Sequence, residues 1–361
     1  MFERRLYHHV DWGLLIAVLT LCGIGLAQIY SATGGWTNTV ETQIYGILLG
    51  LVALVVCLSV DYRSLADKSH LIYIAIVGLL VYVLFFGAVR GGSRRWIDLG
   101  AFNLQPSEFV KAALALVLAK FFGESRRGAI GRVDLVIAAA LTAVPLVIIA
   151  QQPDLGTAAT LIPVAFAVVY LAGMPVRLLG VLTVVGLLAA PVLWQFALED
   201  YQRERIATFL DPEQDARGAG YQQIQARITV GSGGLWGKGF LEGTQGQLRF
   251  LPVAHNDFIF SVLAEEQGFA GVIVALGLYL FVILRSLEAA RLAKDRLGAY
   301  LVLGVLASFT FQVIYNITMS AGLAPVKGLT LPLMSYGGSS MIATLAGFGL
   351  ILNVRMRRFT N

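Results

Sequence analysis

Residues 258–284 read FIFSVLAEEQGFAGVIVALGLYLFVIL, an apolar run with only a few polar side chains near its start. At a rise of 1.5 Å per helical residue, such a run is long enough to cross about 30 Å of hydrocarbon. Residues 13–31 form a second apolar run of this kind. Together the two runs predict a protein whose helices span a membrane.

The composition of the whole chain predicts the same class. Of the 361 residues, 57% are hydrophobic and 14% are charged, and the mean hydropathy is +0.74. These values are too apolar for a soluble domain of this length. The net charge of +5 comes from Lys and Arg in loops and does not indicate a nucleic-acid-binding surface. Cys22 and Cys57 lie inside apolar runs, which suggests neither a disulfide framework nor a zinc site.

The apolar runs predict an all-α polytopic membrane protein with ten transmembrane helices. The predicted spans are 12–31, 43–60, 69–89, 107–122, 133–151, 154–172, 176–197, 258–285, 297–318 and 333–354. Residues 1–361 are predicted to form a single integral membrane domain, with a long loop at 198–257 between the seventh and eighth spans. Gly46 and Gly50 have the GxxxG spacing that predicts close packing of two helices.

The short loops predict the orientation of these spans. If the N-terminus is inside, the cytoplasmic loops hold most of the loop Lys and Arg, as the positive-inside rule requires. The short outer loops then hold only Arg90, Arg94, Arg95 and Lys327. This orientation places both termini in the cytoplasm and the 198–257 loop outside.

Several ionisable residues lie at the predicted outer face. Glu108 and Lys111 are i,i+3 neighbours inside an apolar span, where an unpaired charge is costly, so we expect them to pair. The pair has two open interpretations, as a structural ion pair or as one wall of a substrate cavity. Asp154 is interpreted as the N-cap of the next helix.

Asp257 stands between the long loop and the apolar run that follows it. One interpretation is a residue that caps the helix or complements its dipole. The other is a catalytic carboxylate, because ionisable groups at membrane depth are often functional. Helical periodicity predicts that Asp257, Ser261 and Glu265 share one ridge.

The long loop is rich in glycine between residues 231 and 246, without the spacing of a nucleotide-binding motif. Its basic residues are interpreted as ordinary solvated charge, in preference to ligands of lipid phosphates. These residues are Arg203, Arg205, Lys238 and Arg249.

Five longer motifs follow one another along the chain and resemble the landmarks of the SEDS family, which includes RodA, FtsW and SpoVE. They are GSRRWIDLG at 92–100, QPSEFVK at 105–111, QPDLGTA at 152–158, AHNDFIFSVLAEEQG at 254–268 and NITMSAGLAPVKGLTLPLMSYGGSS at 316–340. Residues 231–252 resemble RodA more than FtsW. Asn256 departs from the family pattern, which usually has threonine beside the aspartate.

The resemblance implies a GT-C-like inverting glycosyltransferase of the bacterial inner membrane. It would polymerise lipid II into peptidoglycan strands during cell elongation and shape maintenance, together with a class B penicillin-binding protein. The family's essential aspartate falls on Asp257. Its ion pair falls on Glu108 and Lys111, its signature lysine on Lys327, and the first two residues of its RWI motif on Arg95 and Trp96. We add Ser261 to this substrate-binding set because of its place on the predicted ridge.

The chemistry implied by the resemblance fits these residue types. A carboxylate can take the proton of an attacking hydroxyl, and Lys and Arg can stabilise a departing pyrophosphate. A divalent cation, Mg or Mn, would bind the same phosphate oxygens, although the sequence shows no dedicated set of ligands for it. Two other classes are weighed against this one, a flippase for lipid-linked precursors and a non-catalytic scaffold. A flippase predicts internal repeats, which we do not find.

Overall fold

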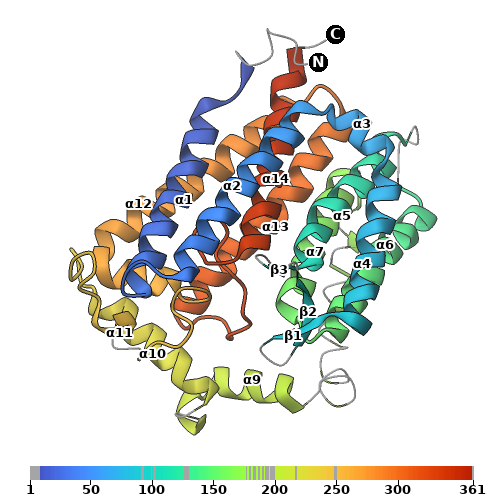
Figure 1. Ribbon diagram of the computed structural model, residues 1–361. Coiled ribbons are helices and arrows are strands. Elements are labelled where there is room, and N and C mark those ends of the chain that lie inside the picture. Colours follow the sequence, from blue (N-terminus) through green and yellow to red (C-terminus); the bar gives the residue numbers. More distant parts are fainter. Residues whose placement is uncertain are drawn as a thin grey trace.

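The computed structural model is a bundle of long apolar helices (Figure 1). It describes residues 9–90, 93–98, 100, 103–125, 130–175, 200–215, 218–247 and 250–359, with scattered positions between 177 and 195. The helices are α1 Trp12–Ala32, α2 Asn38–Ser59, α3 Tyr62–Asp67, α4 Ser69–Phe86, α5 Pro106–Gly123, α6 Arg132–Gln151, α7 Leu155–Leu171, α9 Asp200–Leu210, α10 Ala219–Ser232, α11 Thr244–Gln247, α12 Ile259–Arg291, α13 Arg296–Ser320 and α14 Gly338–Met356. Short 3₁₀ helices cover Pro212–Asp215 and Arg357–Phe359.

Among the described residues, seven helices are long and apolar enough to cross a membrane, and these are α1, α2, α4, α6, α12, α13 and α14. The predicted spans at 107–122 and 154–172 correspond to α5, which carries buried charges, and to the shorter apolar helix α7. The predicted span at 176–197 lies largely outside the described residues. The structure is therefore all-α and polytopic, as predicted.

The two ends of the bundle differ (Figure 1). Helix α1 begins and helix α14 ends at one end, here called the terminal end. Helices α9, α10 and α11 and a small sheet lie at the opposite end, here called the loop end. The predicted long loop thus contains helices of its own, and α10 packs against α12.

The sheet was not predicted from the sequence. Its strands are β1 Ala88–Arg90, β2 Ser93–Asp98 and β3 Asn103–Leu104, paired antiparallel in that order. Strands of two to six residues are too short to show a hydrophobic period. The sheet matters here because β2 carries Arg95 and Trp96 at a fixed register, in which Trp96 is paired with Ala88.

Close packing of α2 against α14 confirms the prediction from the GxxxG spacing. A Cβ added at Gly46 would lie 2.9 Å from the Cα of Gly338, and one at Gly50 would lie 2.5 Å from Cδ1 of Leu345. Neither distance leaves room for a side chain. The two glycines therefore allow the backbones of these helices to approach each other.

Buried polar groups join the helices at the terminal end. Arg355 of α14 contacts Asp11, the N-cap of α1, at 2.8 Å and Glu288 of α12 at 3.2 Å. Asn353 donates through Nδ2 to carbonyl oxygens at the end of α2, those of Cys57, Leu58 and Val60. These are carbonyls that a helix C-terminus leaves without an internal partner. At the terminal end, polar side chains therefore connect the helices to one another. The remaining candidate functional residues lie at the loop end.

Candidate functional site at the loop end

Asp257 lies two residues before α12 and outside the helix. The N-cap of α12 is Phe258, and this helix start has no side-chain cap hydrogen bond. Asp257 therefore does not cap the helix. The prediction that Asp257 shares a helical ridge with Ser261 and Glu265 is also wrong for Asp257, because α12 begins only at Ile259.

The backbone around Asp257 is held by α13 and by the segment that follows it. Asn316 donates through Nδ2 to the carbonyl oxygens of Asp257 at 2.8 Å and of Leu329 at 2.7 Å. The backbone N–H of Tyr336 donates to the carbonyl of His255 at 3.0 Å. Two of the long sequence motifs, 254–268 and 316–340, thus meet at Asp257.

The carboxylate of Asp257 points toward Gly328, where an added Cβ would lie 3.6 Å from Oδ2. Burial raises the pKa of Asp257 to about 6, while the charges of Arg95 and Arg205 lower it and that of Asp154 raises it. The residue keeps some solvent-accessible surface. At neutral pH the carboxylate is therefore mostly ionised, yet it is a stronger base than an ordinary aspartate.

Arg95 and Asp154 form the next part of the site. The guanidinium of Arg95 lies 3.3 Å from Oδ2 of Asp154, which also accepts a hydrogen bond from Gln105 Nε2 at 3.0 Å. Asp154 Oδ1 accepts from the N–H of Thr157 at 3.1 Å, so the predicted N-cap is present. Asp154 is thus both a cap and a charged neighbour of Asp257. Alternation along β2 predicts that Trp96 faces away from Arg95.

Lys327 and Arg205 are two further cations of this region. Lys327 directly precedes Gly328, and its Nζ lies 5.9 Å from the centre of the Tyr315 ring. Burial lowers the pKa of Lys327, and the charge of Arg205 lowers it further. Arg205 lies on α9 and was interpreted as ordinary solvated charge. Arg205 is exposed, as that interpretation predicts, and its charge also lowers the pKa of Asp257 and of Lys327 because α9 folds over this end.

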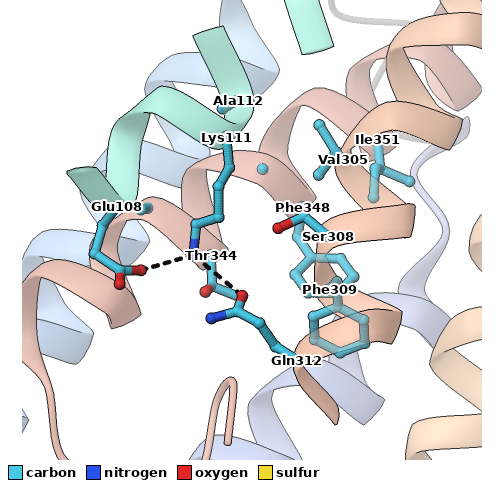
Figure 2. Close-up of a pocket in the computed structure, with 12 residues that line it drawn as sticks. Glu108, Lys111, Ala112, Val305, Ser308, Phe309, Gln312, Thr344, Phe348 and Ile351 are labelled. Atoms are coloured by element: carbon cyan, nitrogen blue, oxygen red, sulfur yellow. Dashed lines mark hydrogen bonds and ion pairs between the residues drawn. The ribbon is translucent and has the colours of Figure 1, made fainter. Parts of the chain in front are cut away.

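A second polar cluster lines a small cavity between α5, α13 and α14 (Figure 2). Lys111 Nζ lies 2.7 Å from Glu108 Oε2 and donates to Gln312 Oε1 at 3.1 Å. Glu108 and Lys111 are both buried, and the predicted ion pair is present. The remaining lining residues are Ala112, Val305, Ser308, Phe309, Ala343, Thr344, Gly347, Phe348 and Ile351.

Helix α13 connects the two clusters. Gln312 and Asn316 are i,i+4 neighbours on one face of this helix, separated by about 6 Å of rise. Gln312 binds Lys111, and Asn316 binds the backbone of Asp257. Neither amide was predicted as a site residue. Asn316 opens one of the quoted motifs, but an uncharged side chain gives little sequence signal.

Ser261 is buried, and Lys238 forms a salt bridge, in contrast to its interpretation as ordinary solvated charge. Ser261 is fully buried inside the start of α12, and its hydroxyl has no hydrogen-bond partner among the described residues. The structure therefore does not place Ser261 on the surface beside Asp257. Arg249 lies outside the described residues. Lys238 pairs with Glu265 at 2.7 Å, so its charge is already compensated.

The predicted divalent cation stays a prediction. Among the residues that the structure describes, no group of three or more His, Cys, Asp and Glu side chains is placed to hold a metal ion. Asp257 and Asp154 are neighbouring carboxylates, which is the type of ligand that Mg²⁺ and Mn²⁺ prefer.

Comparisons with known proteins point to one family. Residues 12–359 match the family described as cell cycle protein, which is named for FtsW, RodA and SpoVE. The chain is 41% identical to the peptidoglycan glycosyltransferase MrdB of Escherichia coli K12 over 350 residues, covering 97% of this chain and 94% of MrdB.

Two solved structures are similar over nearly the whole chain. One is a chain from a peptidoglycan synthase complex described as coordinating polymerization and crosslinking. It has a TM-score of 0.85 and 36% identity, with 98% of this chain and 99% of that chain covered. The other is the rod shape determining protein RodA of Thermus thermophilus, with a TM-score of 0.74 and 33% identity, with 98% of each chain covered.

Proposed function

Because this chain belongs to the family of cell cycle proteins that contains FtsW, RodA and SpoVE, we propose that it polymerises lipid II with Asp257 as the general base. It is a peptidoglycan glycosyltransferase of the RodA type and a multi-pass membrane protein. The observation that carries the proposal is the environment of Asp257. Its carboxylate caps no helix, has a raised pKa and lies among cations at the loop end.

In the proposed reaction, a hydroxyl of the acceptor sugar attacks the anomeric carbon of the donor. A new C–O bond forms as the bond to the donor's pyrophosphate breaks, and the configuration at that carbon inverts. Asp257 takes the proton of the attacking hydroxyl, and the pyrophosphate leaves with the electron pair. Arg95, Arg205 and Lys327 supply positive charge where the leaving group becomes negative.

Glu108 and Lys111 are proposed to bind substrate in the cavity below Asp257. Lys111 is suited to an anionic headgroup, and Glu108 and Gln312 hold its ammonium in place. Trp96 is a further candidate for substrate contact, on the strand that also carries Arg95. A bound Mg²⁺ or Mn²⁺ would add charge stabilisation of the pyrophosphate, with Asp257 and Asp154 as candidate ligands.

The orientation and the partner are part of the proposal. The start of α1 and the end of α14 share one end with a concentration of arginine, and we place this end in the cytoplasm. The loop end then faces outward, where the lipid-linked precursor is used. Ten spans follow if residues 176–197 form the seventh, and the loop lies between the seventh and eighth. A class B penicillin-binding protein is the proposed partner in elongation and cell shape, as the likeness to a synthase complex supports.

A direct test uses purified protein, lipid II and separation of products by length on a gel. Chains of joined disaccharides support polymerisation. Translocation of monomer across a vesicle membrane without chains would instead indicate a flippase, and neither product would indicate a scaffold. Addition of the penicillin-binding protein should raise turnover, because contacts over the loop end would order the catalytic groups. Equal rates with and without it at saturating lipid II would contradict activation by the partner.

A further inference from the structure

Gly268 interrupts α12 near the edge of the hydrocarbon. Its φ of 63° and ψ of −165° are non-helical. Seventeen residues separate it from Arg285, which contacts Asp11 in the terminal-end network. This corresponds to about 26 Å of helix, close to the thickness of about 30 Å of a hydrocarbon core. The interruption therefore lies where the hydrocarbon gives way to headgroups at the loop end.

Backbone groups exposed by this interruption are satisfied by residues 234–239, here called the clamp loop. The N–H groups of Phe269 and Ala270 donate to the carbonyls of Gly234 and Leu235, at 2.9 and 3.1 Å. In return the N–H groups of residues 238 and 239 donate to the carbonyls of residues 265 and 266, each at 3.0 Å. Irregular backbone at membrane depth requires such pairing, because lipid supplies no hydrogen bonds.

The contact between the clamp loop and α12 is too close for side chains. A Cβ at Gly237 would lie 2.1 Å from the carbonyl oxygen of Glu266, and one at Gly268 would lie 2.2 Å from the nitrogen of Gly237. Both glycines also have positive φ. The clamp loop is therefore fixed against α12 and does not move as a free surface loop.

Lys238 of the clamp loop and two carboxylates of α12 face inward. The buried carboxylate of Glu265 accepts from Lys238 Nζ at 2.7 Å and from the N–H of Thr244 at 2.9 Å. The buried Glu266 accepts from Ser31 of α1. Both carboxylates thus face the protein interior instead of water.

Large apolar side chains face the opposite way. Trp236 is 82% exposed, Leu235 is 67% exposed and Phe269 is 58% exposed. The exposed apolar surface continues along α12 through Ile273 and Val274. In Figure 1 the loop between α10 and α11 projects sideways beside α12. A loop that contacts water usually exposes its charged groups and buries its aromatic groups, and this loop does the opposite.

We propose that the clamp loop is a membrane anchor, with Leu235 and Trp236 inserted among phospholipids at the boundary of headgroups and acyl chains. Trp side chains concentrate at this depth because the ring is apolar and its N–H still reaches polar groups. The apolar surface is continuous with a membrane-crossing helix at the correct height, which makes lipid the fitting occupant. The anchor goes beyond the proposed reaction and requires no substrate.

The test places a fluorophore at the anchor and at a polar control position. Trp236→Cys and Glu204→Cys are made in a Cys57→Ala background, where the remaining Cys22 is buried. Glu204 is exposed on α9 at the same end of the molecule. Each variant is labelled with nitrobenzoxadiazole and reconstituted in vesicles of phosphatidylcholine and phosphatidylglycerol, with or without a doxyl-labelled phosphatidylcholine.

We expect doxyl lipid to quench the label at residue 236 at least threefold more than the label at residue 204, with the reverse order for aqueous iodide. Equal quenching at the two positions would overturn the anchor. A label that is shielded only after the penicillin-binding protein is added would also overturn it, in favour of a protein interface.

A second measurement avoids the label. In brominated phosphatidylcholine, Trp236→Phe should remove a clear fraction of the quenchable tryptophan emission relative to the parent. Trp36→Phe provides a comparison at another exposed tryptophan of the loop end. If Trp236→Phe leaves the quenched fraction unchanged, residue 236 does not contact lipid.

Discussion

Replacing Asp257 with asparagine should abolish most activity and leave the fold intact or more stable. The side chain keeps its shape and loses its charge. Loss of a positioned general base lowers rates by about 10²–10⁴-fold. The N-terminus of α12 has no side-chain cap hydrogen bond, and the cost of burying the charge outweighs the favourable charges of Arg95 and Arg205.

The effect on stability can be worked from the pKa of Asp257. It is raised from 3.8 to about 6, so the folded protein prefers the protonated form. At 1.36 kcal/mol per unit, ionisation of this group costs the fold about 3 kcal/mol above pH 6, and less after discounting for its partial exposure. This cost is absent below about pH 4 and grows between pH 4 and 6. Asp257→Asn should therefore be more stable than the parent at pH 7 and equal to it near pH 4.

The assay combines polymerisation of lipid II with melting in detergent at pH 4, 5, 6 and 7. Glu204→Gln is the matched control, since it removes an exposed carboxylate from the same end of the molecule. Asp257→Asn protein with activity within a few-fold of the parent would refute the catalytic role. Melting well below the parent at pH 7 would refute the electrostatic reasoning and indicate a structural aspartate.

Three other changes test the surrounding structure. Glu108→Gln or Lys111→Met alone should destabilise the fold by about 3–5 kcal/mol, because each leaves a buried charge unpaired. The double variant should regain normal melting but stay inactive. An active double variant would show that the pair has only a structural role. Arg205→Gln removes a charge that lowers the pKa of Asp257, so the acidic limb of the pH–rate profile should move to higher pH, and an unmoved limb would exclude this contact. Asn353→Ala should lower stability by about 1–3 kcal/mol in thermal melting, because it leaves buried carbonyls unpaired, with turnover per folded molecule unchanged.

Features that depend on neighbours in the sequence were predictable. Apolar runs located the long helices among the described residues, i,i+3 spacing identified the Glu108–Lys111 pair, and the preference of helix starts for aspartate identified the Asp154 cap. The GxxxG spacing of Gly46 and Gly50 correctly indicated a close helix contact.

Features that depend on long-range packing were not predictable. Arg205 reaches the site only because α9 folds over the loop end. The span was predicted to start at residue 258, next to the observed start at Ile259, but the predicted ridge was extended back to Asp257, which precedes the helix. Glu265 was placed on that ridge as well, and its actual partner Lys238 comes from a loop whose position no local pattern encodes.

The hydrogen bond from Asn316 to the carbonyl of Asp257 has a consequence for repeated turnover. A general base alternates between a charged and a neutral state in every cycle. A neighbouring side chain that bound only one of these two states would change position each time the base gained or lost its proton. The amide of Asn316 carries no charge and donates to the main chain, so its hydrogen bond is the same whether Asp257 is charged or neutral. The position of Asp257 is therefore fixed by a residue that does not itself exchange protons.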